Sequence, residues 1–368
     1  MAPAVILSSD SHVFEPPDLW AKRIDRAFRD RAPRIQRIDG ADQIVIETDQ
    51  ILSGIGLISN AGARFEAPET ISGDGRFEDV PRGGYDPEQH LADMRLDGVA
   101  GEVLYPSQGL FYFRIADSAL MSAIFRAYND WLADFCAADP KRLKGIAMIN
   151  LDDVQEGIAE LERAARLGLA GAMITEHPLD HRRYDQPEYE PFWAAAQELD
   201  MKMSLHSLTS KRQNSDPARG DMLFRSILLY QEVARTMTDL IIHGVLEKFP
   251  TLKFISAENE IAWIPFHLWR MDQLHEKLYT MSPVNLPMKP SDYFNRQFYA
   301  TFIEDPMFAS TTSTMGVDNI MWSSDFPHLA STYPHSRKFI EENLAGLSAT
   351  DQRKIVHDNV AKLYDISL

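Results

Sequence analysis

Cysteine is nearly absent from this chain of 368 residues, in which Cys136 is the single example. No disulfide can form within the chain, and no metal site built from thiolates is expected. Cys136 lies in the apolar run AYNDWLADFCAADP, where a small buried residue is expected rather than a reactive thiol. The chemistry of the chain must therefore come from other side chains.

Positive charge is also scarce, because 37 Lys and Arg stand against 54 Asp and Glu and give a formal net charge of −17. Nucleic acids and anionic membrane surfaces are recognised through clustered basic side chains, so neither is expected as a partner. Long apolar runs are missing too. None approaches the ~20 residues of a membrane span, and the N-terminal run is too short for a secretory signal. We therefore expect a cytoplasmic protein.

The sequence does contain eight apolar runs rich in Val, Ile and Leu, separated by segments of helical periodicity such as VQEGIAELERAARLG. Continuous apolar runs of this length are typical of parallel strands buried on both faces. The predicted strands are AVILSS (4–9), AGEVLYP (100–106), KGIAMIN (144–150), GAMITEH (171–177), KMSLHS (202–207), LKFISAE (252–258), QFYATFI (297–303) and NIMWSSD (319–325).

Eight alternations of strand and helix predict the α/β class and a (β/α)8 barrel of TIM type, although an open doubly wound sheet produces similar local patterns. One domain over residues 1–368 is compatible with this length. Residues 21–85 interrupt the alternation. We predict that they form an insertion between the first two barrel strands, with a small β element and a long loop that covers the site. The polar stretch 209–221 is predicted to be a second, mobile lid.

Ionisable side chains follow several predicted strands. Asp10 and His12 end the first strand, and His206, Glu258 and Asp325 end the fifth, sixth and eighth. The carboxyl ends of barrel strands meet at one mouth, so these side chains are expected to converge. Sheltered carboxylates and imidazoles are costly together unless a cation compensates them. We therefore predict a divalent metal, Zn²⁺ or else Mn²⁺ or Fe²⁺, among these residues.

Four more residues have two interpretations each. Glu15 is a candidate ligand or base, or else a cap of the helix that follows it. His328 can contact substrate or a second metal, or can orient Asp325. His177 can line the barrel mouth, but a position at the surface is expected. His243 is a poorer candidate for the site, because it is expected to pack in a helix outside the barrel.

Four motifs, DSHVFEPPDLW, SLHS, FPTLKFISAENEIAWIP and WSSDFPH, resemble the amidohydrolase-related metal-dependent hydrolase family, which includes aminocarboxymuconate-semialdehyde decarboxylase. The resemblance continues to NVAKLY near the C-terminus. It implies a distorted barrel, with a mononuclear metal in the decarboxylase members. By the same resemblance, Asp10 and His12 are ligands from the first strand, His206 from the fifth and Asp325 from the eighth.

The chain departs from the decarboxylase members at one place, where the resemblance leads us to expect His-Gly-Gly and the sequence has Glu258-Asn259-Glu260. A carboxylate there can act as a general base toward metal-bound water, or can bind a second ion. We therefore expect hydrolysis of a small organic substrate by a metal-activated water, with Asp325, Glu258 and His328 as catalytic residues.

Three alternatives stay open. Non-oxidative decarboxylation of an aromatic or unsaturated acid fits the resemblance. One ion is the main expectation, but the candidate ligands exceed the four that one Zn²⁺ needs, which also allows a dinuclear iron or manganese oxygenase or hydrolase. The chain can also be a metal-bearing subunit of a heteromer. Otherwise a homodimer or another homo-oligomer is expected, because most oligomers are homo-oligomers.

Overall fold

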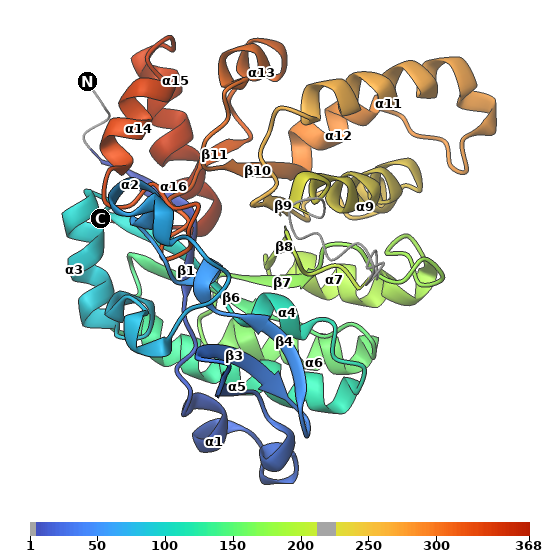
Figure 1. Cartoon of the computed structure of the whole chain (residues 1–368). Helices are drawn as coiled ribbons and strands as arrows, with labels where there is room; N and C mark the ends of the chain where they lie inside the picture. Colours follow the sequence, from blue (N-terminus) through green and yellow to red (C-terminus); the bar gives the residue numbers. More distant parts are fainter. Residues whose placement is uncertain (1–4, 212–225) are drawn as a thin grey trace.

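The structure, a computed structural model, describes residues 5–211 and 226–368. Its main sheet has eight strands that pair in parallel and follow one another in chain order, as a (β/α)8 barrel requires (Figure 1). Each predicted apolar run forms one strand, so the barrel prediction is confirmed. The strands are β1 (Leu7–Val13), β5 (Gly101–Pro106), β6 (Leu143–Met148), β7 (Gly171–Thr175), β8 (Lys202–His206), β9 (Phe254–Ala257), β10 (Phe298–Phe302) and β11 (Ile320–Trp322).

The first and last strands meet where the sheet closes on itself. The Ser9 hydroxyl donates to the Trp322 carbonyl at 2.9 Å, and the Asp325 N–H donates to the Asp10 carbonyl at 2.9 Å. The eight strands thus form a nearly closed barrel. The seam between β1 and β11 also brings Asp10 and Asp325 side by side.

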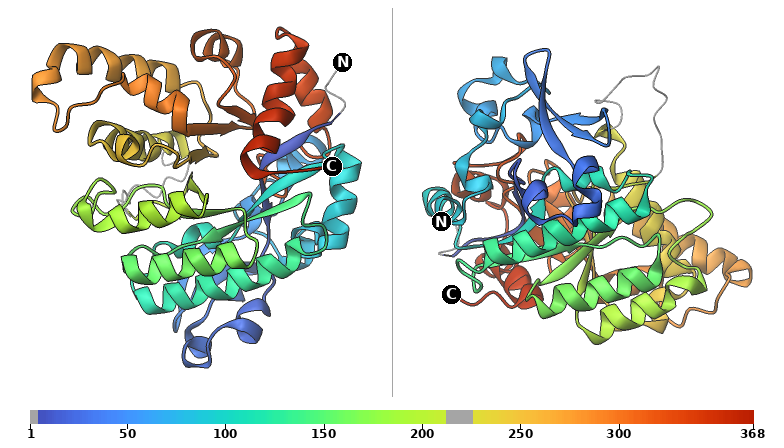
Figure 2. Two further views of the ribbon diagram at one scale, coloured as in Figure 1. Left: turned by 180° about the vertical axis from the view of Figure 1, so that it is seen from behind. Right: turned by 90° about the horizontal axis from the view of Figure 1, so that it is seen from below.

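Helices cover the outside of the barrel on all sides (Figure 2). Several of them begin at an aspartate whose side chain accepts backbone N–H groups of the first turn, as Asp86, Asp117 and Asp153 do. The longer helices are α3 (Pro87–Asp97), α5 (Ser118–Cys136), α6 (Val154–Arg166), α7 (Glu190–Glu198), α9 (Tyr230–Ile242), α11 (Ile264–Leu278), α12 (Pro290–Gln297), α13 (Phe308–Met315) and α14 (Ser336–Asn343). Shorter ones are α1 (Leu19–Arg23), α2 (Ala63–Glu66), α4 (Gly109–Tyr112), α10 (Val245–Lys248), α15 (Ala349–Arg353) and α16 (Asn359–Tyr364).

The segment between β1 and β5 contains an antiparallel sheet of three strands, β2 (Arg34–Ile38), β3 (Ala41–Ile46) and β4 (Gln50–Gly54). It touches the loop that follows β11, because the Leu329 N–H donates to the Leu57 carbonyl at 2.9 Å and the Ala61 N–H to the Pro327 carbonyl at 3.0 Å. The segment therefore lies against the carboxyl end of the barrel. Of the second predicted lid, only residues 209–211 are within the described part, and the rest of that prediction lies outside it.

Cys136 is a buried core residue, as its apolar surroundings in the sequence predict. Cys136 is buried at the end of α5, and burial raises the pKa of its thiol to about 12, so it is an inert packing residue. Among the helices of residues 5–211 and 226–368, none combines the length and the apolar content that crossing a bilayer takes.

Candidate metal centre

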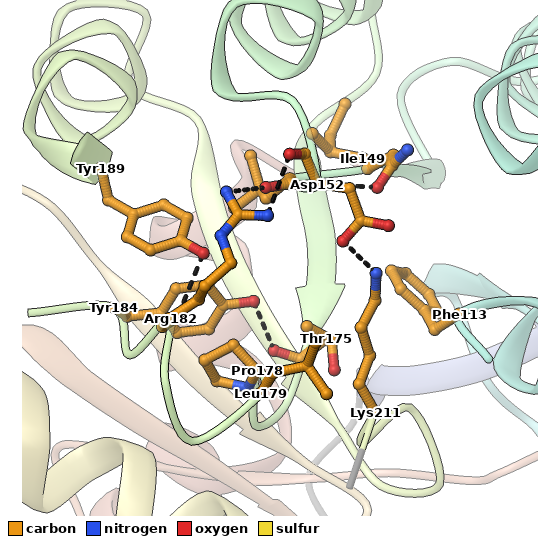
Figure 3. A pocket seen from close by; sticks show the side chains of 12 residues that line it. Phe113, Ile149, Asp152, Thr175, Pro178, Leu179, Arg182, Tyr184, Tyr189 and Lys211 are labelled. Carbon is orange, nitrogen blue, oxygen red and sulfur yellow. Dashed lines mark hydrogen bonds and ion pairs between the residues drawn. The ribbon is translucent and has the colours of Figure 1, made fainter. Parts of the chain in front are cut away.

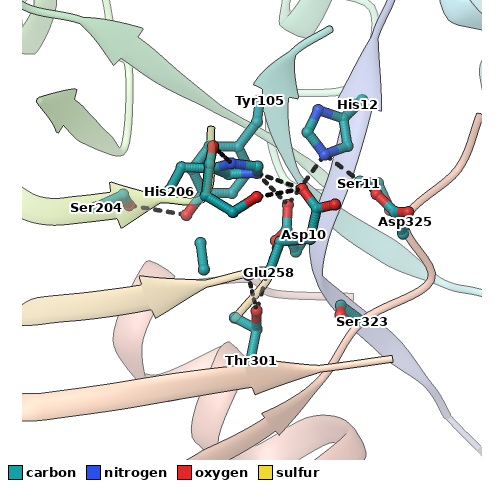
Figure 4. A network of polar contacts seen from close by, with 12 residues as sticks. Asp10, Ser11, His12, Tyr105, Ser204, His206, Glu258, Thr301, Ser323 and Asp325 are labelled. Atoms are coloured by element: carbon teal, nitrogen blue, oxygen red, sulfur yellow. Dashed lines mark hydrogen bonds and ion pairs between the residues drawn. The ribbon is translucent and has the colours of Figure 1, made fainter. Parts of the chain in front are cut away.

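Five ionisable side chains from four strand ends converge inside the barrel mouth (Figure 4). His12 Nε2 lies 3.5 Å from Asp10 Oδ1 and 3.3 Å from Asp325 Oδ1. His206 Nε2 lies 3.6 Å from Asp10 Oδ1 and 3.5 Å from Glu258 Oε2. The side chains of Asp10, His12, His206 and Asp325 are at most 1% exposed, whereas that of Glu258 is 22% exposed. The structure thus brings together the predicted strand-end residues.

Within residues 5–211 and 226–368, the atoms that face one another in this cluster have no hydrogen-bond partner. They are Asp10 Oδ1, His12 Nε2, His206 Nε2 and both carboxylate oxygens of Asp325. Buried polar atoms without partners are costly, so their convergence on one point fits a divalent cation. Two sets of candidate ligand atoms can be drawn, one with His206 and Asp10 and one with Glu258, Asp325 and His328, and both contain His12. They therefore belong to one continuous centre.

The other ring nitrogen of each central histidine is already engaged. His12 Nδ1 lies 3.0 Å from the Pro106 carbonyl oxygen and His206 Nδ1 lies 3.0 Å from the Ser207 carbonyl oxygen. Because a carbonyl only accepts, each Nδ1 must donate, and Nε2 is therefore the nitrogen that each ring can offer to a cation. That is the orientation a metal ligand needs.

The backbone is bent at the residues that supply the carboxylates. The pairing of β1 with β5 shifts register between Ser8 and Ser11, which places Asp10 in a bulge. Glu258 and Asp325 have left-handed φ angles of 54° and 59°, a costly conformation for residues with side chains. Such strain at the ends of β9 and β11 is typical of functional positions.

His328 has contacts that fit both roles expected for it, orienting Asp325 and reaching the metal centre. Its Nδ1 is 3.1 Å from Asp325 Oδ1, its Nε2 is 3.0 Å from the Ser107 hydroxyl, and its ring stacks on that of His12 at 3.8 Å between centroids. These contacts orient Asp325 and His12, and they keep His328 within reach of the centre.

Glu15 occupies a different place from the one expected of a ligand or base. Its carboxylate oxygens accept the backbone N–H groups of Gln108, at 2.9 Å, and Gly109, at 2.8 Å. It therefore caps the start of α4, which follows β5, and not the helix that follows it in sequence. Burial raises the pKa of Glu15 to about 7 against these hydrogen bonds. Because both oxygens are engaged, we do not retain it as a ligand.

Burial and mutual charge shift the pKa values of the cluster in opposite directions. Burial and the neighbouring His328 lower the pKa of His12 to about 4, and burial with His206 lowers that of His328 to about 3. Burial also lowers the pKa of His206, but the Asp10 and Glu258 charges outweigh it and raise the value to about 9. Burial and Asp325 raise the pKa of Glu258 well above its usual range. Among the three histidines of the cluster, His206 is thus the one whose pKa the neighbouring acids raise.

Two other histidines lie apart from this centre. His177 was expected at the surface, but it is fully buried because α9 packs over the end of β7, and its Nδ1 lies 2.8 Å from the Thr236 hydroxyl. His243 ends α9 outside the barrel, as predicted, near Asp239 and Asp185. Asp185 already pairs with Arg183 at 2.9 Å, so we assign no metal to this outer group.

A separate pocket opens between the loops after β6 and β7 (Figure 3). It has a volume of about 340 Å³ with its open mouth, and Tyr184 and Tyr189 form part of its wall. The two basic side chains that line the pocket already have partners within the protein. Lys211 pairs with Asp152, and Arg182 donates to the Asp152 carbonyl at 2.9 Å. Among the described residues that line it, none offers an unpaired charge to a ligand.

Known proteins share this fold. An amidohydrolase from Mycobacterium avium subsp. paratuberculosis K-10 superposes with a TM-score of 0.79 at 21% identity, over 98% of this chain and 99% of the other. A dihydroxybenzoic acid decarboxylase from Polaromonas sp. JS666, solved with bound manganese and the inhibitor 2-nitroresorcinol, gives a TM-score of 0.68 at 23% identity, over 98% and 97% of the two chains.

Sequence relatives point the same way. A gamma-resorcylate decarboxylase from Polaromonas sp. (strain JS666) is 28% identical over 264 residues, which are 69% of this chain and 79% of the relative. A 2-amino-3-carboxymuconate-6-semialdehyde decarboxylase from Dictyostelium discoideum is 22% identical over 258 residues, 69% and 70% of the two chains. The family model for amidohydrolases matches residues 66–366. The resemblance in the sequence motifs is thereby confirmed, and the chain belongs to the amidohydrolase-2 family.

Proposed function

We propose that this chain is a metal-dependent decarboxylase of a small aromatic carboxylic acid. The observation that carries the proposal is the convergence of Asp10, His12, His206 and Asp325, whose facing atoms are buried and have no hydrogen-bond partner among the described residues. Relatives that align with about two thirds of the chain are named as decarboxylases. Decarboxylation therefore replaces hydrolysis, the main expectation from the sequence, as our first choice.

The four buried side chains would hold one divalent cation. When bound, such an ion supplies positive charge that fixes a substrate carboxylate and stabilises negative charge during reaction. Manganese is the first ion to test, because it is bound in the decarboxylase structure from Polaromonas. Zinc and iron remain candidates, since imidazole and carboxylate ligands also suit them.

Glu258 is the residue to which we assign proton transfer. It is the most exposed member of the cluster, at 22% against at most 1% for the other four, so it faces the side from which substrate arrives. Loss of CO₂ breaks the bond between the ring and the carboxyl group and leaves an electron pair on the ring carbon. A protonated Glu258 can deliver a proton to that carbon and regain one from solvent. His328 would keep Asp325 and His12 in place through the contacts described above.

The test uses the purified chain loaded with Mn²⁺ in water enriched in ¹⁸O, with a panel of hydroxybenzoic acids and, as substrates that can be hydrolysed, their esters and amides. We expect one CO₂ for each substrate consumed and a phenolic product that has gained no oxygen from water. A product that carries ¹⁸O, with no CO₂, would contradict decarboxylation.

Hydrolysis is the second candidate, and Glu258 is the observation that favours it. A carboxylate stands where the resemblance to decarboxylases leads us to expect a histidine, and a deprotonated Glu258 can act as a base toward water. The same ¹⁸O experiment separates the two candidates, since hydrolysis places an oxygen of water in the product. Metal analysis tests the dinuclear alternative, which requires two equivalents of iron or manganese.

A further inference from the structure

A buried carboxyl group lies within electrostatic reach of His206 in the metal centre and takes no part in that centre. Glu176 directly follows β7 and is fully buried, and among the described residues no side chain forms a hydrogen bond with its carboxylate, which the Ser210 backbone alone approaches. An unpartnered buried carboxyl group lowers the stability of a fold, so natural proteins rarely retain one without a use. A group from outside the chain is the simplest partner for it.

Glu176 is held at a defined position relative to His206. Thr175 pairs in register with His206 across β7 and β8. The Glu176 N–H donates to the Thr209 hydroxyl at 2.8 Å, and that hydroxyl donates to the His206 carbonyl at 2.7 Å. One side chain thus links the backbone of Glu176 to the backbone of a candidate metal ligand.

The groups around Glu176 define what it can bind. Burial and the Glu232 carboxylate raise the pKa of Glu176 to about 8, while the charges of His206 and Arg114 oppose this shift. Glu232 lies in the first turn of α9, and Arg114 is fixed by a 2.9 Å hydrogen bond to the Leu208 carbonyl. The carboxyl groups of Glu176 and Glu232 disfavour a bound anion. The charges of His206 and Arg114 disfavour a bound cation. A neutral group that donates and accepts hydrogen bonds, such as a hydroxyl, fits best.

We propose that Glu176 determines specificity by forming a hydrogen bond with a hydroxyl group of the substrate bound at the metal centre. The inference rests on the proposed function, because it presumes a small aromatic acid at that centre. A site built to hydrogen-bond a substrate hydroxyl discriminates strongly against analogues that lack it, since the buried group is then left unpaired.

The test measures binding of two probes to the Mn²⁺-loaded protein by calorimetry. The probes are 2-nitroresorcinol, which has two hydroxyls, and nitrobenzene, which has none. We expect the wild-type protein to prefer 2-nitroresorcinol, and Glu176→Leu to reduce that preference by about tenfold. Glu176→Gln, which keeps a hydrogen-bonding group of the same shape, should retain part of it. Glu160→Gln, a buried acid whose partners lie within the protein, serves as the matched control and should leave it unchanged.

Thermal unfolding of the probe-free, Mn²⁺-loaded variants supplies a second readout. Because no side chain in the described part of the protein pairs with Glu176, Glu176→Leu and Glu176→Gln should melt at the wild-type temperature or above it. A probe preference in Glu176→Leu equal to that of the wild type would overturn the inference and leave the proposed function standing. Failure of both variants to fold would show that Glu176 is a structural residue, and it would also overturn the inference while leaving the proposed function standing. A wild-type protein that binds neither probe would overturn the inference together with the proposed function.

Discussion

Single residues of the metal centre differ in what they offer to an ion. His206 directs Nε2 at the centre, where it has no hydrogen-bond partner among the described residues, because its Nδ1 donates to the Ser207 carbonyl. We expect His206→Ala to retain less than about a tenth of the Mn²⁺ that the wild type holds after dialysis, because the substitution removes one of the four candidate ligands. Elemental analysis of the dialysed protein measures this. His243→Ala is the control, and equal metal loss in both variants would contradict the assignment.

Glu258 is expected to behave differently from His206. Glu258→Gln keeps the volume of the side chain but removes its transferable proton. We expect turnover to fall by about 10²- to 10⁴-fold with the metal content unchanged. If metal and activity disappear together, Glu258 is a ligand rather than the acid. Asp325→Asn supplies the comparison. Because Asp325 is assigned as a buried metal ligand, this variant should lose both metal and activity.

At the scale of elements, His90 shows how the outer layer is tied to the barrel. This buried residue of α3 has Nδ1 2.8 Å from the Gly83 carbonyl oxygen and Nε2 2.6 Å from Glu102 of β5. Both partners accept, so the ring must donate from both nitrogens and carry a charge. Burial lowers the pKa of His90, but the Glu102 carboxylate and the Gly83 carbonyl raise it above the usual 6.5.

The sign of the resulting pH dependence follows from that raised pKa. The stabilisation is complete below pH 6.5 and is lost as the pH rises through the pKa of the folded state. We expect His90→Leu to lower the free energy of unfolding by about 1–3 kcal/mol at pH 6 and by less at pH 9. Denaturant melts at both pH values check this, with the exposed His181→Leu as control. A loss that is the same at both pH values would show that His90 is neutral.

The barrel strands were largely predictable, whereas the local geometry at several of their ends was not. Parallel strands buried on both faces leave continuous apolar runs, so each barrel strand, and the ionisable residues that follow β1, β8, β9 and β11, could be found from the sequence. The bulge that places Asp10 cannot be found in this way, because it depends on the register with β5. Glu15 was misjudged because its partners lie on α4, more than 90 residues away. Glu176 and His177 were missed because only the packing of α9 buries them.

At the scale of the whole molecule, the centre couples metal binding to stability. Buried carboxylates and imidazoles from β1, β8, β9 and β11 are brought together only in the folded state. A ligand that binds only the folded state at about 1,000 times its Kd adds about 4 kcal/mol to the free energy of unfolding. We expect Mn²⁺ to raise the melting temperature of the chelator-treated protein and His206→Ala to abolish that rise. An equal rise in the variant would place the ion elsewhere.

The oligomeric state remains a prediction from the sequence. A homodimer or larger homo-oligomer is expected, and light scattering on the purified, Mn²⁺-loaded chain measures its mass. A monomeric mass would contradict the expectation. Recovery of activity only after a second kind of chain is added would favour the heteromer instead.

The central claim is that one metal ion sits where β1, β8 and β11 end. Crystals of the Mn²⁺-loaded protein, recorded at the manganese absorption edge, test it most directly. We predict one anomalous peak per chain, within about 2.0–2.3 Å of Nε2 of His12 and His206 and of a carboxylate oxygen of Asp10 and Asp325. A map with no peak between these four side chains, or with its strongest peak at another site, would contradict the account.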